Sequence, residues 1–303
     1  MRYLPLALLL WLAGCKAGDV YEKQMKDKNY SQTLTPPGTV NIGGGLYYDQ
    51  TPVTNINWRE YLYWLQQIYG GKSPEYLAAL PDTLVWQDSG LQKDSCKCLK
   101  ILSRNYLRHP KYANYPVVGI TQPQAEAFAK WRSDRVMEFI LLRHGVVKRL
   151  MFNKDSCFTI EKYYSGKFNN IKPTPDFSFY PDYRLPTTAE WGKAVKYDDS
   201  LSGKKGKNKE QNLWLDIKPC HADILFATPT ENDDMKKLSD KKRIYNLRDN
   251  VSQWTSEQGI CEGGGWHDTL KAATVQDTFH RSKPNAWTGA RYICTWKKWD
   301  GAR

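Results

Sequence analysis

The sequence lacks any run of about 18 consecutive apolar residues, the shortest length that indicates a helix crossing a bilayer. This excludes a transmembrane helix, although 41% of the 303 residues are hydrophobic. Histidine is scarce as well, with five in the chain. These histidines provide no two ligand pairs at the spacing of zinc ligands, and Cys220-His221 alone is a weak signal, so the sequence does not indicate a structural zinc site.

Acidic residues are the minority among the charges, with 32 Asp and Glu against 44 Lys and Arg and a net charge of +12. A basic surface favours anionic partners, which here means anionic lipid head groups, acidic glycans or an acidic protein face. The alternative is that much of the excess lies in a solvated loop, because residues 204–209 alternate lysine with Gly and Asn.

The N-terminal residues have the pattern of a bacterial lipoprotein signal. Met1-Arg2 is positive, and the apolar run from Leu4 to Leu12 is too short to span a bilayer. It ends in Leu12-Ala13-Gly14-Cys15, where small residues fit a signal peptidase and the thiol is placed to receive lipid. The alternative is an ordinary signal peptide with a chance cysteine. We expect a signal peptide over residues 1–14, lipidation at Cys15, a membrane-bound protein and no nucleic-acid partner.

Seven cysteines are present, six of them after Cys15. An even number in an oxidising compartment predicts disulfides. Cys96 and Cys98 are too close in sequence for an unstrained mutual bridge, so each pairs elsewhere or stays free. The sequence leaves the connectivity open among Cys96, Cys98, Cys157, Cys220, Cys261 and Cys294.

Composition divides the chain into a tether and one domain. Residues 15–42 are polar and rich in lysine, which predicts a lipidated tether. We expect the folded domain over residues 43–303, with insertions near 140–180 and 196–242. The 12 tryptophans and 19 tyrosines, with few long periodic stretches, predict an irregular α+β fold with bulky aromatic packing.

Three helices have clear start or stop signals, and a strand is predicted at 46–49. The first helix covers Trp58 to Ile68 and ends at Gly70. The second begins at Thr121 and the third at Thr187, where capping-box spacing occurs. Their core faces are predicted to carry Trp58, Tyr61, Leu62, Leu65 and Ile68; then Phe128, Trp131, Arg135, Val136 and Phe139; then Trp191, Ala194 and Val195.

Several motifs follow one another in a recognisable order. They are the runs 48–55 and 115–121, Tyr183 to Trp191, Asn250 to Trp254, Gly263 to Trp266, and Gly289 to Tyr292. In order and spacing they resemble the formylglycine-generating-enzyme, or sulfatase-modifying factor, family over nearly all of residues 43–296. The resemblance implies the family's C-type-lectin-like α+β fold, with little regular secondary structure.

Within that family the chain is most similar to the gliding-motility lipoproteins GldJ and GldK of Bacteroidota, whose relatives serve the type IX secretion system. The similarity rests on residues 80–86, on 108–119 and on Trp131 to Val136. The chain departs from the family at Asp249, Gln253 and Ala290, where glycine, glutamate and an aromatic residue are usual. These departures indicate a divergent member.

The resemblance also bears on catalysis. Active members use two cysteines between their Gly-Gly-Ser-Trp and Gly-Phe-Arg segments, where thiolates bind copper(I). No cysteine lies between Trp266 and Gly289 in this chain. His267 and His280 lie there, but an isolated histidine is more often a hydrogen-bonding residue than a ligand. We expect no enzyme activity of this kind. One alternative is an oxidase with an altered metal site that uses His267, His280 or Cys294, and another is a glycan-binding or lipid-binding module.

The other motif residues have structural interpretations, in helix capping, polar pairing and aromatic packing. They are Arg184, Thr187, Glu190, Trp191, Asn250, Trp254, Trp266 and Arg291. No cofactor is expected, because calcium at Asp49 and Asn250 would need about six to eight oxygen ligands and the sequence has no compact carboxylate cluster. We expect a non-catalytic lipoprotein of a type IX secretion or gliding-motility assembly, bound to protein partners on the periplasmic face of the outer membrane.

Overall fold

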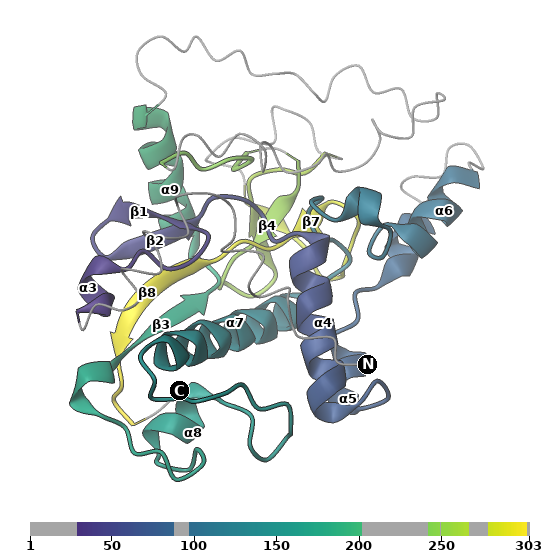
Figure 1. Ribbon diagram of the computed structural model, residues 1–303. Helices are drawn as coiled ribbons and strands as arrows, with labels where there is room; N and C mark the ends of the chain where they lie inside the picture. The colour runs from purple at the N-terminus through teal and green to yellow at the C-terminus, as the bar shows by residue number, and fades with distance from the viewer. Residues whose placement is uncertain (1–28, 88–96, 202–241, 249, 267–277, 302–303) are drawn as a thin grey trace.

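Two four-stranded sheets form the framework of the computed structural model, which describes residues 29–87, 97–201, 242–248, 250–266 and 278–301 (Figure 1). The first sheet has the strand order β1-β2-β8-β3 and is antiparallel throughout. The second has the order β6-β5-β4-β7, with β4 and β7 parallel. The strands are β1 (Thr39–Gly43), β2 (Leu46–Asp49), β3 (Phe179–Arg184), β4 (Ser252–Trp254), β5 (Ile260–Glu262), β6 (Phe279–His280), β7 (Thr288–Gly289) and β8 (Ile293–Lys298).

Helices pack around these sheets, and none in the described part of the chain is both long and apolar enough to cross a membrane. The α-helices are α3 (Tyr30–Thr33), α4 (Asn55–Tyr69), α5 (Pro74–Ala78), α6 (Lys97–Asn105), α7 (Gln122–Arg143), α8 (Ile160–Tyr164) and α9 (Thr188–Leu201). Short 3-10 turns lie at η1 (Thr83–Gln87), η3 (Pro110–Tyr112) and η4 (Pro175–Phe177).

Local hydrogen bonds fix the ends of α4 and α7. Thr54 and Asn57 form a capping box at the start of α4, and Gly70 ends the helix with a φ of 92°. Thr121 and Gln124 form the same box before α7, as the sequence predicted. The five residues predicted for the core face of α4 are all buried. On α7, Phe128, Arg135 and Phe139 are buried, whereas Trp131 and Val136 are only partly so.

Both faces of the first sheet are covered by helices. Neighbouring residues of a strand point to opposite sides, so they enter different core clusters. Tyr47 packs into a cluster with residues of α4 and α7. Tyr48, the next residue, packs against Trp191 of α9. Helix α7 lies along β3 on one side of the sheet and α9 lies on the other (Figure 1). The aromatic core predicted from composition is therefore divided by this sheet.

The ordered fold begins before the boundary that the sequence indicated at residue 43. Tyr30, the first residue of α3, and Leu34, which follows its last residue, are 1% and 0% exposed. Both belong to a core cluster with Phe177 and Tyr180, and β1 already pairs with β2. The predicted tether therefore ends too late, because a polar composition hid two side chains that long-range packing buries. Residues 202–241, most of the second predicted insertion, lie outside the described residues.

Charged side chains of α7 hold the segment that follows it. Asp134 accepts a hydrogen bond of 3.0 Å from the Ile160 amide, at the start of α8. Arg135 donates to the Phe158 carbonyl at 2.5 Å and also pairs with Glu138. Glu138 is 2% exposed, and its second carboxylate oxygen has no hydrogen-bond partner among the residues that the structure describes. Burial therefore raises the pKa of Glu138 to about 7, although Arg135 opposes the shift.

This raised pKa predicts a pH-dependent loss of stability. The unfolded chain releases the Glu138 proton near its ordinary pKa of 4.5, whereas the folded chain keeps it until about 7. The folded state therefore binds more protons in that window, and the free energy of unfolding falls as pH rises through it. We expect Glu138→Gln to flatten this decline in urea denaturation at a series of pH values. Exposed Glu161→Gln is the control, and parallel wild-type and Glu138→Gln curves would contradict the assignment.

Candidate functional site

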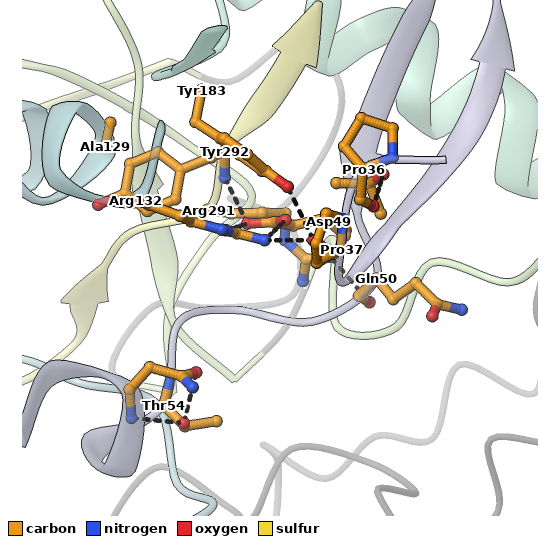
Figure 2. Close-up of polar contacts among 12 residues, drawn as sticks. Pro36, Pro37, Asp49, Gln50, Thr54, Ala129, Arg132, Tyr183, Arg291 and Tyr292 are labelled. Atoms are coloured by element: carbon orange, nitrogen blue, oxygen red, sulfur yellow. Dashed lines mark hydrogen bonds and ion pairs between the residues drawn. The ribbon is translucent and has the colours of Figure 1, made fainter. Parts of the chain in front are cut away.

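A buried ion pair joins the first sheet to α7 at the place where the motifs converge. Both terminal guanidinium nitrogens of Arg132, Nη1 and Nη2, donate to the carboxylate of Asp49 at 2.8 Å. The two side chains are 15% and 4% exposed. Figure 2 shows Arg132 also donating to the Pro37 carbonyl, at 2.7 Å, while the Tyr292 amide donates to Asp49 at 3.1 Å. The pair therefore joins four parts of the chain: the N-terminal arm, which is residues 29–38 before β1, then β2, α7 and the start of β8.

The environment of Arg132 favours its charged form. Burial is the largest single influence and lowers its pKa, but the Asp49 carboxylate, together with Tyr183 and Cys294, holds the pKa above the ordinary value. The guanidinium also lies over the Tyr183 ring, with its carbon 4.1 Å from the ring centroid. Because the cation occupies both Asp49 oxygens, a calcium ion at Asp49 would have to displace Arg132. The pair therefore has a structural role, and we call such a buried arginine that joins separate segments a clasp.

Arg291 forms a second clasp and is 0% exposed. It donates to the carbonyls of Asp49 at 2.9 Å, Gln50 at 3.1 Å and Asn246 at 3.0 Å, and also to Tyr245. These bonds attach the segment around residues 244–247 to the end of β2. The glycine-arginine motif of the sequence therefore places a buried cation among main-chain oxygens.

The start of α9 carries the polar pair expected from the Arg184-to-Trp191 motif. Arg184 contacts both oxygens of Glu190 at 2.7 Å. The Glu190 amide donates to the Thr187 hydroxyl at 3.1 Å, and the Thr187 amide donates to Glu190 at 2.9 Å. The bond from Arg184 is the main reason why the pKa of Glu190 is lowered. The structure thus shows both bonds of the expected capping box.

Removing this cap has a predictable cost. Thr187→Ala deletes the hydroxyl that accepts the Glu190 amide, and loss of such a cap typically costs about 0.5 to 2 kcal/mol. We expect the urea midpoint of the variant to fall accordingly with no change in slope. Thr188→Ala, one position later and outside the capping box, is the matched control. Equal stability of the two variants would contradict the role of Thr187.

Two of the motif tryptophans use their indole nitrogens to join distant segments. Trp254 donates to the Ile120 carbonyl at 3.0 Å, and Trp266 donates to Ala286 at 2.7 Å. Trp191 is 1% exposed beneath the first sheet. Asn250 has a φ of 66°, and its carbonyl accepts the Trp266 amide at 2.8 Å. All four residues therefore have structural roles in the folded core.

The segment between Trp266 and Gly289 is where the resemblance implies catalysis. His267 lies outside the described residues. His280 is exposed on β6 and lies opposite Ile260 of β5. Within the described part of the chain, no group of three or more His, Cys, Asp or Glu residues is arranged to hold a metal ion.

The described cysteines are buried in the core. Cys261 lies in β5 and Cys294 in β8, each 0% exposed, and burial raises the pKa of the Cys294 thiol well above its ordinary value. Cys157 and Cys294 form no disulfide, so the predicted disulfides are wrong for these two, which pack as small apolar side chains. Cys96, Cys220 and the Cys98 side chain lie outside the description.

Sequence patterns did not reveal two buried polar contacts. Nothing linked Asp49 to Arg132, which are 83 positions apart. Gln253 and Glu262 lie directly opposite each other on β4 and β5, 0% and 1% exposed. Gln253 donates to the Asn246 carbonyl at 3.1 Å. The sequence held one signal for the hydrogen bond from Gln253 to Asn246, which is that Gln253 stands where the family usually has glutamate.

Comparisons with known proteins agree with the motifs. The model of the family described as "Sulfatase-modifying factor enzyme 1-like domain" matches residues 14–295. No curated protein matches the chain. The solved structure of Treponema denticola variable protein 1 is similar at 17% sequence identity, with 89% of this chain and 90% of that chain covered and a TM-score of 0.40. The chain therefore belongs to the sulfatase-modifying factor enzyme 1-like family and has its mixed α+β fold, with modest regular secondary structure.

Proposed function

We propose that this protein is a non-catalytic, lipid-anchored component of a type IX secretion or gliding-motility assembly, on the periplasmic face of the outer membrane. The single observation that carries the non-catalytic part is that no cysteine lies between Trp266 and Gly289. Without a thiolate pair there, the chain lacks the soft ligands that copper(I) needs in this family. The buried Cys261 and Cys294 belong to the core cluster instead.

The polar motif residues support the same proposal. Arg184 pairs with Glu190, Arg132 pairs with Asp49, and Arg291 binds main-chain oxygens. Charged groups that are engaged within the fold stabilise it and are poorly placed to bind or turn over a substrate. The assembly and its compartment are inferred from the resemblance to gliding-motility lipoproteins and from the Leu12-to-Cys15 pattern.

The chemistry is tested with the purified protein, copper(I) and a sulfatase-type cysteine peptide. We expect neither stoichiometric copper binding nor aldehyde formation on the peptide. Aldehyde formation with bound copper would overturn the non-catalytic assignment and favour the oxidase with an altered metal site. His280→Ala would then show whether that residue belongs to the site.

The assembly is tested by affinity purification of the tagged protein from its native membranes, followed by identification of the co-purifying proteins. We expect components of the secretion or motility machinery in stable proportion. If the protein is recovered alone but binds an acidic glycan in a salt-dependent manner, the binding-module alternative replaces the assembly role.

The lipid anchor is tested at Cys15. Cys15→Ala removes the thiol that receives lipid, so we expect release from the membrane fraction or an uncleaved precursor. Fractionation combined with labelling by fatty acid measures both outcomes. Label that persists on the Cys15→Ala protein would show that the acceptor lies elsewhere.

A further inference from the structure

The N-terminal arm enters the folded body at a defined corner. The Tyr30 hydroxyl donates to the Phe179 carbonyl at 2.5 Å, where β3 begins. The Trp296 indole donates to the Leu34 carbonyl at 3.2 Å, near the end of β8. In Figure 1, α3 lies beside this part of the first sheet. The path of the chain from residue 30 onward is therefore fixed against the ends of β3 and β8.

Exposed basic residues outnumber exposed acidic ones among the sequence neighbours of the core cluster that buries Tyr30. The exposed lysines in question directly precede or follow residues of the core cluster around Tyr30. Together with Phe179 they are called the basic end. The lysines are Lys148, Lys167, Lys172, Lys297 and Lys298, and the exposed acidic neighbours of the same cluster are Glu161, Asp176 and Asp300. Positive charge therefore exceeds negative charge among the exposed neighbours of this cluster.

An exposed aromatic side chain lies beside one of these lysines. Phe179 is 36% exposed and lies directly opposite Lys298 in the pairing of β3 with β8. Directly opposite residues of an antiparallel pair project from the same face. An exposed aromatic ring next to lysines is the combination that binds at the interface of an anionic bilayer.

We propose that the basic end lies against the anionic head groups of the membrane that carries the protein. This inference rests on the proposed lipid anchor at Cys15. Cys15 and Tyr30 are 15 positions apart, so even a fully extended chain spans at most roughly 50 Å between them. The anchor therefore holds the point where the arm enters the fold within roughly 50 Å of the bilayer, which favours lipid over an acidic protein as the partner of this surface.

The test separates the surface from the anchor by using the mature chain, residues 15–303, with Cys15→Ser. Its binding is measured by sedimentation with vesicles of phosphatidylcholine alone and of phosphatidylcholine with phosphatidylglycerol. We expect binding to the anionic vesicles that weakens with salt. Each lysine near the surface contributes about fivefold, so Lys297→Gln with Lys298→Gln should weaken binding roughly 30-fold.

The matched control carries Lys193→Gln and Lys196→Gln, two exposed lysines of α9, which packs in the core cluster around Trp191 and not in the cluster that buries Tyr30. Its binding should stay within about twofold of the unmodified chain, because this change in net charge is the same but lies away from the basic end. Equal weakening of both double variants, or no preference for anionic vesicles, would overturn the proposal and leave an acidic protein as the partner. Flotation of the lipidated protein with neutral vesicles reports on the anchor alone.

Discussion

Replacing Trp191 with alanine should lower the free energy of unfolding by about 3 to 5 kcal/mol, the usual cost of truncating a large buried aromatic side chain. Trp191 is 1% exposed and packs with Val40, Tyr48 and Ile293. Its loss would therefore leave a cavity between α9 and three strands of the first sheet. Urea denaturation of the soluble domain measures the effect.

Two controls define what the Trp191 result means. Tyr63→Ala removes an aromatic side chain that is 53% exposed on α4, and it should change stability by no more than about 0.5 kcal/mol. Exposed His280→Ala should leave both folding and assembly nearly intact. If His280→Ala abolishes function in a folded, correctly localised protein while Trp191→Ala is tolerated, the structural role proposed here is wrong.

Breaking the Asp49 and Arg132 pair should be comparably damaging. Arg132→Met leaves a carboxylate that is 4% exposed without its cation. Removing one partner of a buried pair costs about 3 to 5 kcal/mol, because the remaining charge stays desolvated. Addition of Asp49→Asn should recover part of that loss, since the double variant buries no unpaired charge. Thermal and urea unfolding of the four proteins in the cycle give the coupling energy.

The control for this pair is an exposed one of the same type. Arg248 and Asp199 are 36% and 54% exposed, and Arg248→Met should cost no more than about 1 kcal/mol. If Arg132→Met is as mild as Arg248→Met, Asp49 is solvated in solution and the clasp contributes little to stability.

The features that could be predicted from the sequence are those encoded by neighbouring residues. The starts of α7 and α9 depend on side chains three positions apart, and Gly70 alone ends α4. Such signals are complete within a short window. The family motifs likewise located the tryptophans that bind main-chain carbonyls.

What the sequence did not reveal depends on distant partners. Tyr30 and Leu34 stand in a polar segment, and their burial is decided by residues of β3, α7 and β8. Nothing near Arg132 in the sequence predicts that its partner is Asp49, which lies in β2. Cys157 and Cys294 stay free because each is buried in the core. An even number of cysteines in the sequence does not indicate where each one lies in the fold.

The strand order of the first sheet has a consequence for how the chain can be completed. β1 and β2 form a hairpin near one end of the sequence, and β3 lies in the middle, yet both β2 and β3 pair with β8 and not with each other. A ribosome makes β8 after all the other described strands, so the edges of β2 and β3 that pair with it stay unsatisfied until residues 293–298 have emerged. Such long-range closure slows folding and exposes strand edges to misassembly. A chain truncated before Ile293 would keep both halves of this sheet and lose the strand that joins them.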